Sequence, residues 1–244
     1  MKKFFMFLAV FGLVAFAADS ALAQEANELS VASDIPVYQQ IKIKFIEGGA
    51  GFMATVLLCL IFGLAIVIER IIYLNMATTN TTKLLNKIEG ALNEGGIEAA
   101  KEVCRNTRGP VASIFYQGLL RADEGVEMVE KSVVSYGGVQ MSQLESGLSW
   151  ITLFIAIAPS LGFLGTIIGM IAAFDAIAIA GDISPNIVAG GMKVALITTV
   201  GGLIVVIILQ LFYNYLVSKI DSLVLAMEDS SIALVDMIAA YNKR

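Results

Sequence analysis

The chain has 244 residues, of which 57% are hydrophobic and only 15% are charged, and its formal net charge is −5. A mean hydropathy of +0.81 is far above that of a soluble domain and predicts that lipid surrounds much of the chain. The absence of histidine excludes His-based zinc sites and histidine bases. The absence of a basic run argues against a nucleic-acid partner, and nothing in the sequence indicates a cofactor.

The N-terminus has the three parts of an export signal, over residues 1–23. Lys2 and Lys3 precede an apolar stretch, residues 4–18, which ends before the small-residue cleavage pattern Ala21-Leu22-Ala23. We therefore expect a cleaved signal peptide and a mature chain that begins outside the cytoplasm. The alternative is an uncleaved first anchor helix.

Residues 24–48 are predicted to form a periplasmic segment with one short helix that starts near Pro36. Tyr38, Ile41 and Phe45 fall on one face of that helix, as in an amphipathic helix lying on the outer membrane surface. An outward extension of the first membrane span explains the same residues equally well.

Three apolar segments are predicted to cross the membrane, at residues 49–68, 149–174 and 187–217. A bilayer core of about 30 Å needs about 20 helical residues, so the third segment must tilt or project beyond the lipid. Ser184-Pro185 has the residue types of a helix start. The fold class is therefore an all-α membrane protein, with residues 175–186 as a periplasmic loop and residues 218–244 as a cytoplasmic C-terminal helix.

The basic residues indicate the orientation in the membrane. The link 175–186 has no Lys or Arg, whereas the long segment 69–148 and the C-terminal tail carry many. Because cytoplasmic loops are enriched in Lys and Arg, we expect a multi-pass protein of the bacterial inner membrane. Its N-terminus would be periplasmic and its C-terminus cytoplasmic.

Residues 69–148 are predicted to form a cytoplasmic helical domain. Its pattern favours helices over residues 82–93, 97–106, 110–121 and 126–148, with breaks at Gly95-Gly96 and Gly109-Pro110. The last of these helices is expected to run straight into the second span.

The second and third spans each carry a stripe of small and polar residues. Thr166 lies on the face of the second span that includes Gly162 and Gly169, and Thr199 lies on a face of the third span with Gly202 and Gln210. Asn214 lies at the margin of that face. Unpaired polar groups are costly in lipid, so a shared lumen would explain Thr166, Thr199, Gln210 and Asn214 as lining an ion path.

Small residues also allow close packing of helices in membranes. Under that interpretation, the two stripes join helices within the subunit, and a threonine hydroxyl can bond its own helix backbone. We expect helix-packing roles for Pro159, Gly162, Gly165, Gly169 and Gly202.

The sequence resembles the MotA/TolQ/ExbB proton-channel family, most closely its ExbB and TolQ branch. The resemblance lies in the ordered pair of segments LESGLSWITLFIAIAPSLGFLGTIIGM (residues 144–170) and VALITTVGGL (residues 194–203), the latter followed by Tyr213-Asn214. It covers most of the mature chain, including the first span with its charged inner end.

The resemblance implies a homopentamer whose second and third spans line a pore. A single-span partner resembling ExbD or TolR, with an intramembrane aspartate, would sit in that pore. It would deliver the energy of proton flow to a TonB-like protein. The family threonines fall on Thr166 and Thr199. Val194 stands where many members carry a glutamate, so no acid remains in the pore spans.

Three other functions remain open at this stage. A TolQ-like or gliding-type motor subunit would use the same architecture for a different process. A non-conducting membrane scaffold would explain the small residues without an ion path. An enzyme is disfavoured, because the spans offer no His, Asp or Glu for catalysis.

Overall fold

The computed structural model describes residues 36–181 and 185–242, and all of its elements there are helices. The chain divides into two units, Met1–Glu47 and Gly48–Arg244. In the first unit, helix α2 spans Val37–Glu47, where the short helix was predicted. Its apolar side chains Tyr38, Ile41 and Ile46 are exposed, and its position at a membrane surface stays a prediction. The predicted signal peptide lies outside the described residues.

Three helices of the second unit are long and apolar enough to cross a membrane: α3 (Ala50–Ala77), α7 (Leu148–Ala180) and α8 (Pro185–Tyr241). Helices α7 and α8 contain the predicted segments 149–174 and 187–217, and α3 contains the predicted segment 49–68 except Gly49. Helix α8 has 57 residues and is unbroken, which corresponds to about 85 Å at about 1.5 Å per residue. Because a bilayer core is about 30 Å thick, much of α8 must lie outside the lipid.

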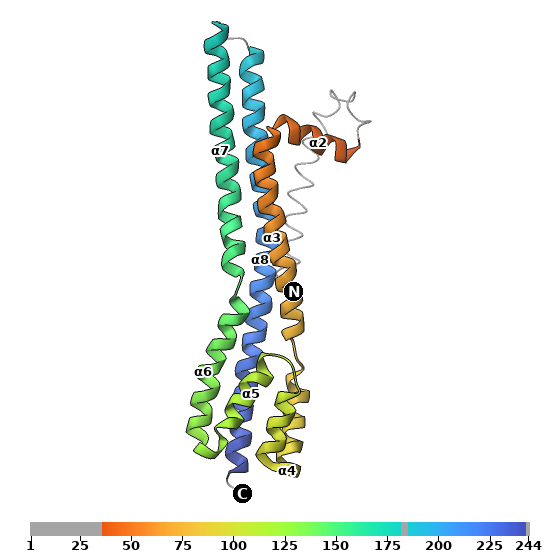
Figure 1. Cartoon of the computed structure of the whole chain (residues 1–244), viewed down its shortest axis with the longest axis vertical. Coiled ribbons are helices and arrows are strands. Elements are labelled where there is room, and N and C mark those ends of the chain that lie inside the picture. The colour runs from red at the N-terminus through yellow and green to blue at the C-terminus, as the bar shows by residue number, and fades with distance from the viewer. Residues whose placement is uncertain (1–35, 182–184, 243–244) are drawn as a thin grey trace, which may run out of the picture. The chain divides into compact units, whose positions relative to one another are not determined.

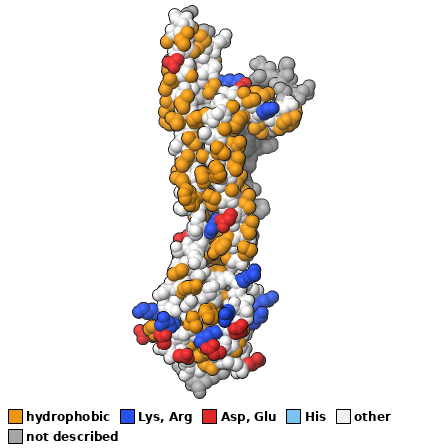
Figure 2. All heavy atoms as spheres, viewed as in Figure 1, with side chains coloured by type: hydrophobic (Ala, Val, Ile, Leu, Met, Phe, Trp, Pro, Cys, Tyr) orange, Lys and Arg blue, Asp and Glu red, His pale blue; other side chains and the backbone are white. Residues whose placement is uncertain are grey.

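The C-terminal part of α8, residues 218–241, packs with the shorter helices of the chain (Figure 1). These are α4 (Thr81–Arg105), α5 (Pro110–Leu120), the 3₁₀ turn η1 (Ala122–Glu124) and α6 (Val126–Glu145). We call this assembly the polar helical domain. Figure 2 shows most charged side chains of the second unit on this end, whereas the stretch covered by α3, α7 and α8 is largely hydrophobic.

An apolar core holds the polar helical domain together. Phe115 and Leu119 of α5 are fully buried, as are Ile88 of α4, Val129 of α6 and Leu234 of α8. Burying side chains of this size contributes about 1.5–3 kcal/mol each to folding. The order of helices was predicted correctly because each apolar face repeats with the helical period.

Glycines mark the helix breaks. Gly96 has φ 70° inside α4, and Gly109 has φ 120° just before Pro110, which opens α5. Both breaks were predicted. The prediction that the last helix of this region runs straight into the second span is wrong, because the chain breaks at Ser146 and Gly147. Gly147 has φ 86°, a left-handed conformation that favours glycine.

The connection between α7 and α8 is shorter than the predicted loop. Helix α7 continues to Ala180, so the first six residues of the predicted loop 175–186 are helical. Gly181 closes the helix with φ 69°, and its N–H donates to the Ile177 carbonyl oxygen over 3.0 Å. Helix α8 begins at Pro185, as expected from the proline, and continues without a break into the predicted C-terminal helix.

Candidate functional site

Helices α7 and α8 lie in backbone contact along their small-residue stripes (Figure 1). A Cβ atom added to Gly202 would lie 2.7 Å from the Ala158 carbonyl oxygen and 3.2 Å from Gly162 Cα. At Gly169, an added Cβ would lie 3.0 Å from the Ala195 backbone nitrogen. A side chain at Gly202 would push the two helices apart, and one at Gly169 would press tightly on Ala195, so these glycines permit the close approach.

Thr166 of α7 and Thr199 of α8 meet in this contact, and their hydroxyls are hydrogen-bonded to each other. Two carbonyl oxygens, those of Gly162 on α7 and Ala195 on α8, lie within reach of both hydroxyls. Gly162 is four residues before Thr166, and Ala195 is four residues before Thr199. Thr166 Oγ1 is 3.3 Å from the Gly162 carbonyl oxygen and 3.1 Å from that of Ala195. Thr199 Oγ1 is 3.4 Å and 3.3 Å from the same two oxygens. The result is a reciprocal cluster of four oxygens, which we call the threonine cluster.

The threonine cluster contains two hydroxyl protons and more acceptors than donors. Each hydroxyl has one O–H to give, while the two carbonyls and both hydroxyl oxygens can accept. A hydroxyl can therefore turn from its carbonyl to another acceptor without breaking the helix ladder. Chemically, the cluster can solvate a negatively charged oxygen that approaches it, and it carries no charge of its own.

The threonine cluster lies on the side of the α7–α8 contact turned away from α3. Gly165 of α7 faces α3, since an added Cβ there would lie 2.6 Å from the Phe52 ring. On α8, Gly201 faces α3, with Met53 at 2.9 Å from an added Cβ. Thr166 is about 100° around its helix from Gly165, and Thr199 is about 160° around its helix from Gly201. The Thr199 side chain therefore points away from the α3 side and that of Thr166 points sideways from it, and both side chains are only half-buried.

Two further polar residues of α8 lie on its open surface. Asn214 is exposed and Gln210 is half-buried, and the Gln210 amide nitrogen donates to the Asn214 amide oxygen over 3.4 Å. They do not contact Thr166 or Thr199, which lie further along the helix. The structure thus brings two of the four predicted ion-path residues together and places the other two on an exposed face.

Pro159 sits inside α7 without ending the helix. It has no N–H to donate to the carbonyl four residues earlier. One residue later, the Ser160 hydroxyl donates to the Ala156 carbonyl oxygen over 2.9 Å. The carbonyl that Pro159 leaves without its usual donor is that of Ile155, so the Ser160 bond lies beside this gap, and α7 continues through the proline as spanning helices commonly do.

Sequence reasoning missed Thr198. This side chain is only 1% exposed, and its hydroxyl donates to the Ala195 carbonyl oxygen over 2.8 Å. An added Cβ at Gly165 would lie 2.7 Å from Thr198 Oγ1, so Gly165 makes room for it. The doubled threonine in VALITTVGGL was the available signal. It also provides a natural pair for comparison, because Thr198 bonds only the Ala195 carbonyl of its own helix, whereas Thr199 also reaches Thr166 and the Gly162 carbonyl of α7.

The sequence left open whether the two stripes face a lumen or join helices within the subunit. Ala158, Gly162, Gly169 and Gly202 are buried in the contact between α7 and α8 of one chain, and the functional role of the two stripes stays a prediction. An ion path along Thr166 and Thr199 stays a prediction. The segments 148–174 and 194–217 contain no Asp or Glu.

Comparison with known proteins gives the same family. A protein of Methanothermobacter thermautotrophicus, named as a biopolymer transport protein ExbB homolog, is 33% identical over 163 residues, or 66% of this chain and 57% of that protein. Biopolymer transport protein exbB1 of Vibrio cholerae is 44% identical over 69 residues, which cover 28% of this chain and 30% of that protein. An ExbB-like protein of Synechocystis is 29% identical over 159 residues, covering 63% and 74%.

The matches span 57% and 30% of the length of the first two relatives, so they share a part of those proteins with this chain. The family match covers residues 106–229, which include α5, α6, α7 and most of α8. The threonine cluster and both glycine stripes lie inside it. This membrane-integral chain therefore belongs to the MotA/TolQ/ExbB proton channel family.

Proposed function

We propose that the chain is an ExbB-like subunit of a proton-driven motor in the bacterial inner membrane. Five copies form a ring, and a single-span ExbD- or TolR-like partner with an intramembrane aspartate lies inside it. The motor would deliver its work to a TonB-like protein for uptake across the outer membrane. The observation that carries this proposal is a cluster of two hydroxyls, with no acid nearby, on the open side of the α7–α8 pair in a proton channel family.

The proposed topology follows from charge. The polar helical domain and the C-terminus lie in the cytoplasm, because segment 69–148 carries eight Lys and Arg residues: Arg70, Lys83, Lys87, Lys101, Arg105, Arg108, Arg121 and Lys131. The α7–α8 connection and the N-terminus then lie in the periplasm.

In the proposed mechanism, the partner aspartate is the proton carrier and this chain supplies its surroundings. The charged carboxylate needs hydrogen-bond donors in a medium of low dielectric constant. Thr166 and Thr199 can each turn an O–H toward it from the threonine cluster. The neutral, protonated aspartate no longer needs these hydrogen-bond donors, so it can move past apolar side chains such as Ile155 and Val206.

The energy available from one proton is similar to the energy of the hydrogen bonds that the partner aspartate would gain or lose. A proton-motive force of about 150 mV supplies about 3.5 kcal/mol per charge. A hydrogen bond to a charged group contributes about 1.5–3 kcal/mol. One or two hydroxyls that bind the charged state but not the neutral state are therefore enough to link proton passage to movement of the partner.

Native mass spectrometry of the co-expressed proteins tests the proposal. The full chain is produced with the single-span protein encoded beside it that carries an intramembrane aspartate. We expect a ring of this chain with a smaller number of partner copies. A monomer, or a dimer without partner, contradicts the motor and favours a non-conducting scaffold.

Which cellular process the motor drives is a separate question, and uptake assays of a deletion strain answer it. Loss of TonB-dependent uptake after deletion of the gene supports the ExbB-like role. Normal uptake combined with defective outer-membrane constriction or gliding assigns the same machine to a TolQ-like or gliding-type process.

A further inference from the structure

A groove runs between α6 and α8 in the polar helical domain. Its floor is apolar, formed by Ile114, Val133 and Met227, and its hollow measures about 470 Å³. A Cβ atom added to Gly137 or Gly138 would meet nothing within 4 Å, so these glycines keep the α6 wall low. Two glycines inside a helix cost about 1 kcal/mol each relative to alanine. We call this feature the α6–α8 groove.

The groove is longer than one hollow. A second hollow shares Val133, Val134, Ser231 and Ile232 with the first and extends it to Glu130 and Asp236. From Met141 to Glu130, the groove follows about three turns of α6, which is about 17 Å at about 1.5 Å per residue. It can therefore hold a segment of about a dozen helical residues.

The groove carries large apolar side chains on its rim. Val134 of α6 is 69% exposed and Ile232 of α8 is 63% exposed. Met141 lies seven residues from Val134, on the same face of α6, and is also exposed. A contiguous exposed apolar surface of this kind marks an interaction site on a protein.

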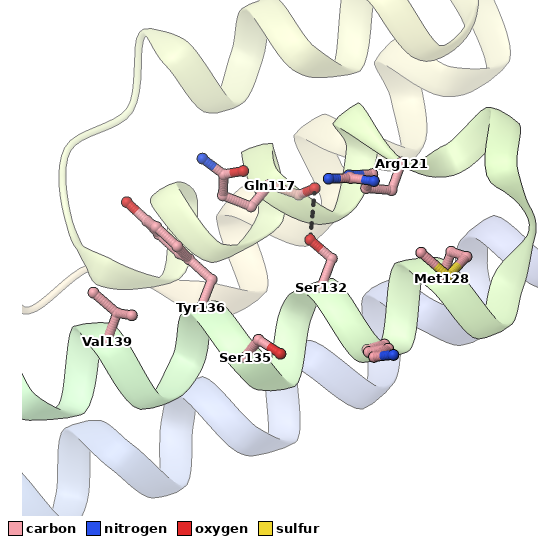
Figure 3. A pocket seen from close by; sticks show the side chains of 8 residues that line it. Gln117, Arg121, Met128, Ser132, Ser135, Tyr136 and Val139 are labelled. Atoms are coloured by element: carbon pink, nitrogen blue, oxygen red, sulfur yellow. Dashed lines mark hydrogen bonds between the residues drawn. The ribbon is translucent and has the colours of Figure 1, made fainter.

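The charges along the groove have one sign. Glu130, Glu228 and Asp236 line its hollows, and a third hollow nearer the apolar spans is lined by Glu145 and Asp221. Among residues 36–181 and 185–242, no Lys or Arg lines any of these three hollows. On the other face of α6, by contrast, Arg121 and Lys131 line a hollow beside α5 (Figure 3). The basic residues near α6 thus line a different hollow from the carboxylates of the groove.

The groove continues the open face of α8. Asn214, Asp221, Glu228 and Ile232 are separated by seven, seven and four residues, so they lie on one face of this unbroken helix. Gln210, four residues before Asn214, belongs to the same face. A segment that leaves the neighbourhood of Gln210 and Asn214 along α8 therefore meets Asp221 and then the groove.

We propose that the α6–α8 groove binds the cytoplasmic flank of the single-span partner. The inference rests on the proposed function, which places the partner beside the open face of α8. The cytoplasmic flank of a spanning segment is enriched in Lys and Arg. A basic flank with apolar side chains at helical spacing matches both the apolar floor and the acidic rim.

Site-specific photo-cross-linking in the full complex tests this. Benzoylphenylalanine is placed at Val134 or Ile232, and at Leu120 as the matched control. Leu120 is also an exposed apolar residue of the polar helical domain, at 42% exposure, but it lies outside the groove. We expect adducts with the partner at both groove positions, with the cross-linked peptide mapping to its cytoplasmic flank, and none at Leu120.

Three results overturn the inference. One is an adduct between two copies of this chain at both groove positions, which assigns the groove to the ring itself. Another is equal partner adduct at Leu120. The last is no partner adduct at Val134 or Ile232 in a complex that native mass spectrometry shows to contain the partner. If the partner is missing from the complex, the proposed function fails as well, so the two failures are distinguishable.

Charge reversal gives a second readout. The double change Asp221→Lys and Glu228→Lys is compared with Glu94→Lys, an exposed carboxylate on α4. We expect the groove variant to lower the adduct yield by about tenfold at low salt, because like charges then face each other. The control leaves the yield unchanged. Equal yields in both variants contradict a basic occupant.

Discussion

At the scale of single residues, the α7–α8 contact depends on glycines, which have no side chain to hold the two helices apart. Gly162 and Gly202 bring two helix backbones together, and this close approach is what lets each threonine hydroxyl reach a carbonyl of the other helix. In lipid, association of helices depends on such packing, because the solvent is as apolar as the side chains. The glycines thus contribute to the stability of the helix pair, and they also allow the hydrogen bonds of the threonine cluster to form.

Gly202→Ala should therefore destabilise the protein more than an ordinary glycine change. Its Cβ would lie 2.7 Å from the Ala158 carbonyl oxygen, so the helices must separate. Overpacking of this kind costs about 1–3 kcal/mol. Gly190→Ala on the same helix is the control, because its Cβ meets nothing within 4 Å. Thermal unfolding in detergent measures both, and equal melting temperatures would contradict the packing role.

The thiol of Cys104 gives a prediction about pH. Burial in α4 raises the pKa of Cys104 to about 12. A group whose pKa is raised on folding stabilises the fold at low pH. Here that contribution is complete below pH 9 and declines as the pH rises toward 12. In a Cys59→Ala background, maleimide should label Cys104 slowly at pH 8 and 10 and rapidly after unfolding. Rapid labelling of the folded chain at pH 8 is the contrary result.

Sequence periodicity placed Thr166 and Thr199 on particular faces of their helices. It did not predict which residues surround them. A helical wheel gives the direction of a side chain relative to its own helix, and the identity of the facing helix depends on tertiary packing. Thr198 was missed for the same reason, since adjacent threonines point about 100° apart and only the contacts with Gly165 distinguish their roles.

At the scale of the elements, the break between α6 and α7 separates the polar helical domain from a spanning helix, while α8 passes the same level unbroken. Sequence analysis found the breaks at Gly96 and Gly109, where a second glycine or a proline accompanies the glycine. It missed the break at Ser146-Gly147, because a single glycine in an otherwise helical pattern is commonly tolerated. The left-handed conformation of Gly147 arises from the fold.

Gly147→Ala should cost stability at this junction. Alanine at φ 86° is strained by about 1–2 kcal/mol, and its Cβ would lie 2.9 Å from Arg70 Nε. Gly90→Ala, inside α4 with nothing within 4 Å of its Cβ, should instead be neutral or stabilising. The melting temperature of Gly147→Ala should fall, and that of Gly90→Ala should stay the same or rise. A stabilised Gly147→Ala chain would show that α6 and α7 can form one continuous helix.

At the scale of the whole molecule, the described spans offer hydroxyls and amides but no carboxylate. Residues 49–68, 149–174 and 187–217 contain no Asp or Glu, so such a chain can solvate a proton carrier but offers no carboxylate in these segments to carry protons itself. The long α8 connects the threonine cluster with the polar helical domain through one unbroken helix. Motion of a partner along the open face of α8 would therefore affect both the threonine cluster and the polar helical domain.

Proton flux into proteoliposomes separates these roles. The chain alone should conduct no protons, and the complex with its partner should conduct. Thr199→Val removes one of the two hydroxyls of the threonine cluster, and we expect it to lower flux by about tenfold or more, since the hydrogen bond to a charged carboxylate contributes about 1.5–3 kcal/mol. Thr198→Val is the matched control, with the same change one residue earlier at a hydroxyl buried beside Gly165. It should assemble and conduct nearly normally, and equal loss in both variants would show that the two hydroxyls act only through helix packing.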